Sequence, residues 1–217
     1  TYTSKISGQK KNVYPLEVVN FGFVSVKPAT VAIDNASETT ADKNENKNIS
    51  TFTRQFYLAR ANEGQIILRS NQKGITYEEL FSPYLIGAKQ IEVTDPYIRL
   101  PYQIRNFIEF TALVHKIREV GEEVQLILNT VSDEEFTTKV KSDLDCLSDS
   151  LEGTGVLFSY NIDNKFHDRS ILPDNGWKIV LGRGLDIWKK TNGPFDIAER
   201  YQELRLCKDC EITFLKV

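Results

Sequence analysis

Three residues in the last third of the chain could form a phosphoryl-transfer site. His167 and Arg169 are two positions apart, and Asp174 follows five positions later. On a β-strand, residues two apart project to the same face, so His167 and Arg169 would point into one pocket while Asp168 points away. There the imidazole could attack phosphorus and the guanidinium could hold its oxygens. Asp174, past a bend, could orient the imidazole or balance the charge of the arginine.

Arginine at position 169 favours phosphate binding rather than phosphoryl transfer, because guanidinium is a rigid fork that suits bidentate binding. A purely structural interpretation of Asp174 stays open. The run PDNG at 173–176 lies between two apolar segments and is typical of a hairpin turn, so the carboxylate could serve the turn alone.

The composition predicts a packed globular domain without a general affinity for polyanions. The chain has 217 residues, of which 41% are hydrophobic and 11% aromatic. Its net charge of -3 and its pI near 5.6 differ from the basic balance of domains that coat nucleic acids. Any phosphate site must therefore be local. The one dense basic cluster, equally typical of a solvated face, consists of Lys165, Arg169, Lys178, Arg183, Lys189 and Lys190.

Cysteine content and hydropathy suit a cytoplasmic protein. Three cysteines favour a reducing compartment, and the C-x-x-C motif of Cys207 and Cys210 has no second ligand pair for a zinc site. We expect no metal and no cofactor. No apolar run is long enough to span a membrane, and the start lacks a signal core. The absence of methionine, even at position 1, suggests a fragment or a processed product.

The chain divides into three parts by composition. Residues 1–33 carry clustered β-branched and aromatic side chains and predict a small β segment, such as the end of a preceding domain. Residues 34–50 are mostly polar and predict a flexible linker. Residues 51–217 alternate strand and helix patterns, which predicts an α/β domain with a mixed sheet flanked by helices.

Within 51–217, capping boxes at 76–79 and 132–135 and Pro101 mark three helix starts, and Gly121 marks the end of the second helix. A fourth, short helix is expected over 195–203. Strands are expected at 65–69, 91–94, 124–128, 156–160, 166–172, 177–181 and 211–215, and those at 156–160, 166–172 and 177–181 are predicted to form a meander.

Five blocks, in order, resemble the phospholipase D-like domain at the C-terminus of MIT-domain proteins. They are ITYEELF at 75–81, DPYIR at 95–99, HDR at 167–169 with DNGW at 174–177, GRGLD at 182–186 and LRLC at 204–207. The resemblance covers about 51–217 and places His167, Arg169 and Asp174 on the H-x-K-x-x-x-x-D motif, with arginine for lysine. It implies a phospholipase D-like fold and a homodimer that binds acidic phospholipid headgroups without hydrolysis. It also suggests a setting at the tail of a larger bacterial protein, such as a Lon-related ATPase of phage-defence loci.

The leading hypothesis is a non-catalytic, homodimeric module that binds a phosphate group on an acidic lipid headgroup or a nucleic acid, with peripheral membrane contact at most. One alternative is a dimeric phosphodiesterase or nuclease with His167 as nucleophile, since the chain holds one motif copy and two His167 residues would have to meet. Another is a structural assembly domain of a Lon-related ATPase. Asp95, Tyr97 and Arg99 follow a strand end, where α/β sheets build sites, although Asp95 could equally shape a turn. The candidate ligand-binding residues are Arg169, Lys178, Arg183, Asp95, Tyr97 and Arg99.

Overall fold

The computed structural model describes residues 51–132, 134–193 and 195–217. The β segment and the linker expected within residues 1–50 lie outside the described residues. The elements are α1 (Thr51–Leu58), β1 (Gly64–Leu68), α2 (Tyr77–Leu85), β2 (Gln90–Thr94), α3 (Pro101–Ile117), β3 (Val124–Thr130), α4 (Glu134–Ser150), β4 (Val156–Ile162), β5 (Ser170–Pro173), β6 (Trp177–Leu181) and β7 (Cys210–Lys216).

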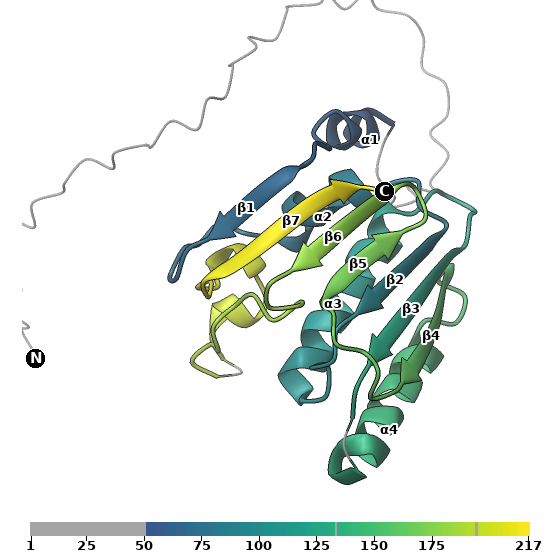
Figure 1. The fold of residues 1–217 in the computed structure, drawn as a ribbon, viewed down its shortest axis with the longest axis vertical. Helices are drawn as coiled ribbons and strands as arrows, with labels where there is room; N and C mark the ends of the chain where they lie inside the picture. The colour runs from purple at the N-terminus through teal and green to yellow at the C-terminus, as the bar shows by residue number, and fades with distance from the viewer. Residues whose placement is uncertain (1–50, 133, 194) are drawn as a thin grey trace, which may run out of the picture. The chain divides into compact units, whose positions relative to one another are not determined.

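One seven-stranded mixed sheet organises the domain, with the strand order β1-β7-β6-β5-β2-β3-β4. Strands β2, β3 and β4 run parallel, whereas β1, β7, β6, β5 and β2 are joined by antiparallel pairings. Helices α2, α3 and α4 lie behind the sheet in Figure 1. The predicted mixed α/β fold with helices against the sheet is confirmed, and the helices α2, α3 and α4 lie on one of its faces.

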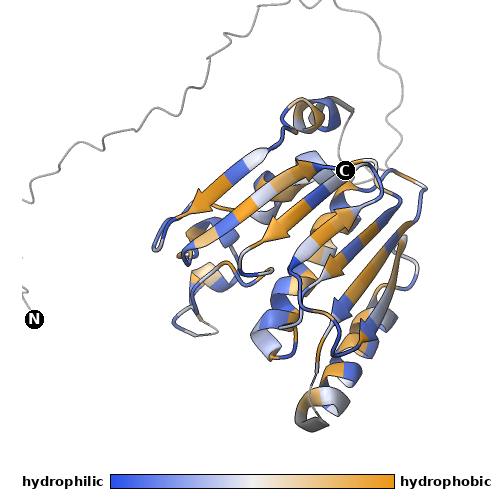
Figure 2. Ribbon diagram, viewed as in Figure 1, coloured by the Kyte–Doolittle hydropathy of each residue, from blue (hydrophilic) through white to orange (hydrophobic). Residues whose placement is uncertain are grey.

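The core forms between this helical layer and one face of the sheet. Along β2, Ile91 and Val93 are buried while Glu92 and Thr94 are partly exposed, which is the alternation expected of a strand with one covered face. Phe107 and Phe110 of α3 pack fully buried against that face. Figure 2 shows hydrophobic residues along most strands, with hydrophilic residues between them.

The helix starts follow from their capping residues. Thr76 accepts a hydrogen bond from the Glu79 N–H through its side chain (3.2 Å), which confirms the start of α2. Pro101 occupies the first turn of α3, where its missing N–H costs nothing. The predicted end of this helix at Gly121 is too late, because α3 stops at Ile117 and Arg118 already adopts an extended conformation.

Two expectations about the C-terminal half are wrong. β4 does not form a meander with β5 and β6. Helix α4 forms the crossover from β3 to β4, so β4 pairs parallel with β3 and is the last strand of the sheet. The chain then returns through residues 163–169 and inserts β5 beside β2. The strand predicted over 166–172 is consequently shorter and begins only at Ser170.

The helix predicted over 195–203 is replaced by two 3-10 turns, Ile197–Glu199 and Gln202–Leu204. The side chain of Arg205 accounts for this difference. Its guanidinium donates to the carbonyls of Ala198 (2.8 Å) and Glu199 (3.0 Å). These carbonyls would otherwise accept backbone N–H groups in a continuing α-helix.

Candidate phosphate-binding site

The antiparallel register of β5 brings three separate loops to one edge of the sheet. Ser170 at the start of β5 pairs with Thr94 at the end of β2, and also with Val180 near the end of β6. The turn after β2, the residues before β5 and the turn after β6 therefore meet at the carboxyl ends of the parallel strands, where open α/β sheets build their sites. We call this place the carboxyl edge and define it by Asp95, Tyr97, Arg169 and residues 182–186.

Arg169 is held on two sides at the carboxyl edge. Its Nη1 donates to the carbonyl oxygen of Gly182 (2.7 Å), and its guanidinium carbon lies 4.6 Å from the ring centroid of Tyr97. The ring provides a cation-π platform, since its face carries partial negative charge. The other guanidinium N–H groups donate to no residue that the structure describes. Arg169 is thus oriented and still has donors for an anion.

Asp95 is a structural anchor of this edge. Its side chain is only 2% exposed, and its two carboxylate oxygens accept the backbone N–H groups of Tyr97 (3.0 Å) and Leu185 (3.1 Å). Burial raises the pKa of Asp95, and the two backbone N–H groups and Arg169 oppose this rise. These bonds tie the turn after β2 to the turn after β6. Asp95 therefore positions the site, and both of its carboxylate oxygens are already engaged by the backbone.

Gly184 makes this close approach feasible. Its φ is +63°, and a Cβ at this position would lie 1.9 Å from Oδ2 of Asp95. A side chain would therefore displace the carboxylate. Asp95 and the GRGLD block at 182–186 are both recognisable in the sequence, but their contact is not. No local pattern links positions 95 and 184, since their contact depends on the sheet order.

The remaining candidates at this edge are Arg183, Tyr97 and Arg99. Arg183 is exposed, and its Nε donates to the backbone carbonyl of Asp209 (2.8 Å), which leaves its terminal nitrogens outward. Tyr97 is 46% exposed above the guanidinium of Arg169. Arg99 is half-buried in the same turn, where its N–H bonds the Tyr97 carbonyl (2.9 Å). The structure therefore brings Arg169 and Tyr97 into contact at the surface, and Arg183 directly follows Gly182, whose carbonyl Arg169 bonds.

His167 lies in the loop before β5 and not on a strand. The expectation that it shares a strand face with Arg169 through residue alternation is therefore wrong. Its imidazole is exposed and bonds to no other described residue. The side chain is accessible, but nothing in the described part of the chain orients it.

Asp174 and Lys178 lie at the opposite end of β5 and β6. Asp174 follows Pro173, which pairs with Ile91 near the start of β2, and its Oδ1 accepts the N–H of Lys89 (2.9 Å). It lies five positions along the chain from Arg169, a span of about 16 Å when the chain is extended. Lys178 pairs with Leu215 at this same end. We call this place the turn edge, defined by Lys89, residues 174–176 and Lys178, and the turn interpretation of Asp174 is the one its geometry fits.

The two cysteines of the C-x-x-C motif lie in the core. Cys207 and Cys210 are buried and not joined in a disulfide, and burial raises the pKa of both thiols. Among the residues described, no group of three or more histidine, cysteine or acidic side chains is arranged to hold a metal ion. None of the described helices is both long and apolar enough to cross a membrane.

Comparisons with known proteins agree with the site's sequence blocks. A family model described as the phospholipase D-like domain at the C-terminus of MIT matches residues 74–216. MIT domain-containing protein 1 of Mus musculus is 34% identical over 149 residues, which are 68% of this chain and 59% of that protein. The chain thus spans about three fifths of the length of this relative.

A solved structure with some similarity is the phosphatidylserine synthase of Haemophilus influenzae Rd KW20. The match has 12% sequence identity and a TM-score of 0.32, and it covers 69% of this chain and 33% of the synthase. These values are too low to support an argument about activity. The family match alone covers well over half of the chain. The chain therefore belongs to the family of phospholipase D-like domains found at the C-terminus of MIT proteins.

Proposed function

We propose that this domain is a non-catalytic, dimeric module that binds a phosphate group at the carboxyl edge. The observation that carries the proposal is the separation of the motif residues. Arg169 is oriented by Gly182 and Tyr97 and keeps free donors, whereas Asp174 is bonded to the backbone of Lys89 at the other end of β5. A phosphoryl-transfer site needs a nucleophile held by a base or orienting group, and His167 has none among the described residues.

The phosphate is expected on an acidic lipid headgroup or on a nucleic acid. Both present oxygens that guanidinium groups bind bidentately, and Arg169 and Arg183 lie at one edge. The net charge of -3 restricts binding to this local patch. A cytoplasmic location, peripheral membrane contact and a place at the tail of a larger bacterial protein, such as a Lon-related ATPase, belong to this same proposal.

The second face of the sheet supports the dimer. Leu172, Val180 and Leu215 are exposed on the face opposite the helices, where they alternate with buried residues along β5, β6 and β7. Ile67 of β1 is also exposed, and it pairs with Glu211, which lies on the same face of β7 as Leu215. Apolar side chains on neighbouring strands β1, β7, β6 and β5 form a surface that a second copy of the domain could cover. Light scattering should give twice the chain mass, and Leu172→Glu with Val180→Glu should give a monomer. A monomeric wild type would refute dimerisation.

Binding and cleavage assays on matched variants test the ligand proposal. Vesicles with phosphoinositides, single-stranded DNA and double-stranded DNA serve as probes. Arg169→Ala should weaken binding about 10-fold or more, since a charge-assisted hydrogen bond contributes roughly 1.5–3 kcal/mol. Arg183→Glu should also weaken binding, and both variants should lower its salt dependence. His167→Ala and the turn-edge control Lys178→Ala should bind as wild type does.

The same assays distinguish the rival functions. Phosphodiester hydrolysis that His167→Ala abolishes would favour an enzyme, in which two exposed His167 side chains meet across a dimer. Equal loss of binding in the Arg169, His167 and Lys178 variants would contradict a local phosphate site. Absence of binding to all three probes would favour an assembly domain.

A further inference from the structure

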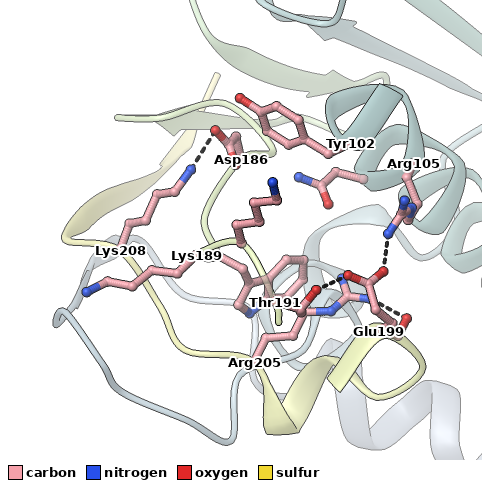
Figure 3. Close-up of a pocket in the computed structure, with 11 residues that line it drawn as sticks. Tyr102, Arg105, Asp186, Lys189, Thr191, Glu199, Arg205 and Lys208 are labelled. Atoms are coloured by element: carbon pink, nitrogen blue, oxygen red, sulfur yellow. Dashed lines mark hydrogen bonds and ion pairs between the residues drawn. The ribbon is translucent and has the colours of Figure 1, made fainter. Parts of the chain in front are cut away.

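A cavity lies beside α3 and meets the carboxyl edge only at Asp186. It has a volume of about 350 Å³ and is formed by the first half of α3 together with residues 186–191 and 199–208 (Figure 3). Its lining includes Tyr102, Asn106 and Trp188 but not Arg169, Arg183 or Tyr97. This volume lies in the range of small-molecule sites, which begins near 300 Å³.

One buried polar side-chain atom on the cavity wall has no partner among the described residues. Trp188 is 4% exposed, and its Nε1 has no acceptor in the described part of the chain. Buried polar groups are almost always hydrogen-bonded, so this N–H needs a partner. Asn106 lines the same cavity, and its amide is hydrogen-bonded to no described residue and is not sealed from solvent, which leaves it open to a ligand. Together they offer one acceptor and donors from an amide and an indole.

The indole is fixed in place by its neighbours. The guanidinium carbon of Arg205 lies 5.1 Å from the ring centroid of Trp188, and the ring of Tyr77 lies 4.6 Å from it. Arg205 is itself held by Glu109, with nitrogen-oxygen distances of 2.6 and 2.7 Å. Trp188 therefore cannot turn to find another acceptor, and its N–H direction is set in advance.

The charges around the cavity favour an anion. Figure 3 shows both acids of the lining already engaged, Asp186 with Lys208 (2.7 Å) and Glu199 with Arg105. Lys190 is exposed and forms no ion pair with a described residue. With the acids neutralised, the uncompensated charge of Lys190 makes the cavity attractive to a negative group.

Tyr102 adds a flat surface on the α3 side. Its side chain is 45% exposed and lines the same cavity. Aromatic rings are sequence-tolerant platforms for nucleobases, since every base has a π face. The cavity thus combines an ammonium group, a ring and an amide, and an asparagine amide can pair with the edge of a base through one donor and one acceptor.

We propose that this cavity binds a small phosphate monoester with a planar ring, of the size of a nucleoside monophosphate. The phosphate would lie at Lys190 beside Arg105, the ring against Tyr102, and the polar edge of the ring at Asn106. The site goes beyond the proposed function, because its lining shares only Asp186 with the carboxyl edge and includes none of Arg169, Arg183 and Tyr97. Either site can therefore fail in an experiment without the other.

Isothermal titration calorimetry with AMP, CMP, GMP and UMP tests this site, with inorganic phosphate and adenosine as the two halves of one ligand. At least one monophosphate should bind more than tenfold tighter than either half. Lys190→Ala and Asn106→Asp should each weaken it about 10-fold, the second by placing a negative charge beside the ligand. Binding of a short single-stranded oligonucleotide that is weakened by the same variants would show that one nucleotide of a nucleic acid can make the same contacts.

Arg169→Ala and Lys178→Ala are the controls and should leave nucleotide binding unchanged. Thermal melts confirm that each variant is folded. Tyr102→Ala, which alters an exposed ring, replaces Asn106→Asp if that protein does not fold. Absence of binding by all four monophosphates at millimolar concentration would overturn the proposal. So would an equal loss in Arg169→Ala, which would assign the binding to the carboxyl edge.

Discussion

The carboxyl edge and the turn edge, at opposite ends of β5, use their polar residues differently. At the turn edge, Asp174 accepts the Lys89 N–H, and the amide of Asn175 donates to the carbonyls of Tyr84 (2.9 Å) and Ile86 (3.2 Å). These side chains are engaged by the backbone. At the carboxyl edge, Arg169 bonds one carbonyl and keeps further donors. The polar groups of the turn edge are used within the fold, whereas Arg169 at the carboxyl edge keeps donors that no described residue uses.

This difference shows why motif spacing is a weak guide to a site. The H-x-R-x-x-x-x-D pattern begins before β5 and ends after it, and β5 connects the carboxyl edge to the turn edge. Residues that a linear motif groups together are separated by a strand. Asp95 and Gly184, 89 positions apart, are instead in direct contact.

Alanine at two glycines should give the largest contrast between the edges. Gly184 and Gly176 both have positive φ, +63° and +86°, so alanine costs about 1 kcal/mol of backbone strain at either. Only at Gly184 would the new Cβ meet the Asp95 carboxylate, at 1.9 Å, whereas at Gly176 its nearest contact is the Val217 carbonyl at 3.6 Å. We expect Gly184→Ala to lower the free energy of unfolding by about 3 kcal/mol or more, because overpacking adds to strain.

Urea denaturation of Gly184→Ala, Gly176→Ala and wild type measures this contrast. Equal losses for the two variants would mean that Asp95 can move away from Gly184 at no cost. The anchoring role of Asp95 at the carboxyl edge would then be wrong.

Asp174→Ala should separate stability from binding in the opposite direction. The substitution leaves the N–H of Lys89 without its side-chain acceptor, which should cost about 1 kcal/mol of folding free energy. Phosphate binding should stay within twofold of wild type, because Asp174 is at the turn edge. Urea denaturation and vesicle binding on the same sample check both parts. A variant of normal stability that no longer binds would place Asp174 in the ligand site after all.

The sequence predicted the helices and strands well, and the order in which the strands pair less well. Capping residues such as Thr76 and Pro101 act locally, and they mark helix starts that the structure confirms. The order of strands depends on where the chain crosses over, so nothing local revealed that β5 inserts beside β2 while β4 lies at the edge. The short β5, and with it the position of His167 in a loop, followed from that order.

Site prediction shows the same limit. Arg169, Tyr97 and Arg183 follow or precede strand ends, a position that can be recognised from sequence, and the structure brings Arg169 into contact with Tyr97 and with the carbonyl of Gly182, next to Arg183. Asn106 was missed because its position within a helix gives no sign that it lines a cavity. The cavity depends on residues 186–191 and 199–208 lying beside α3.

The smallest expected effect is a pH dependence at Asp95. Burial raises the pKa of this carboxyl in the folded protein, so the folded state binds the proton more tightly than the unfolded chain does. Its contribution to stability is therefore fully present below the ordinary carboxyl pKa of about 4 and is lost as pH rises through the folded value. Asp95→Asn cannot titrate, and it loses one of the two acceptors for Tyr97 and Leu185 at every pH.

Unfolding free energies from pH 4 to pH 8 should reveal this dependence. The stability advantage of wild type over Asp95→Asn should be greatest at pH 4 and decline to a plateau as the carboxyl ionises. Gly176→Ala, which changes no titratable group, should run parallel to wild type. An advantage that grows with pH would show that Arg169 and the two backbone N–H groups stabilise the carboxylate more than burial penalises it. The carboxyl edge would then hold a satisfied ion pair, with less of the Arg169 charge left for a phosphate.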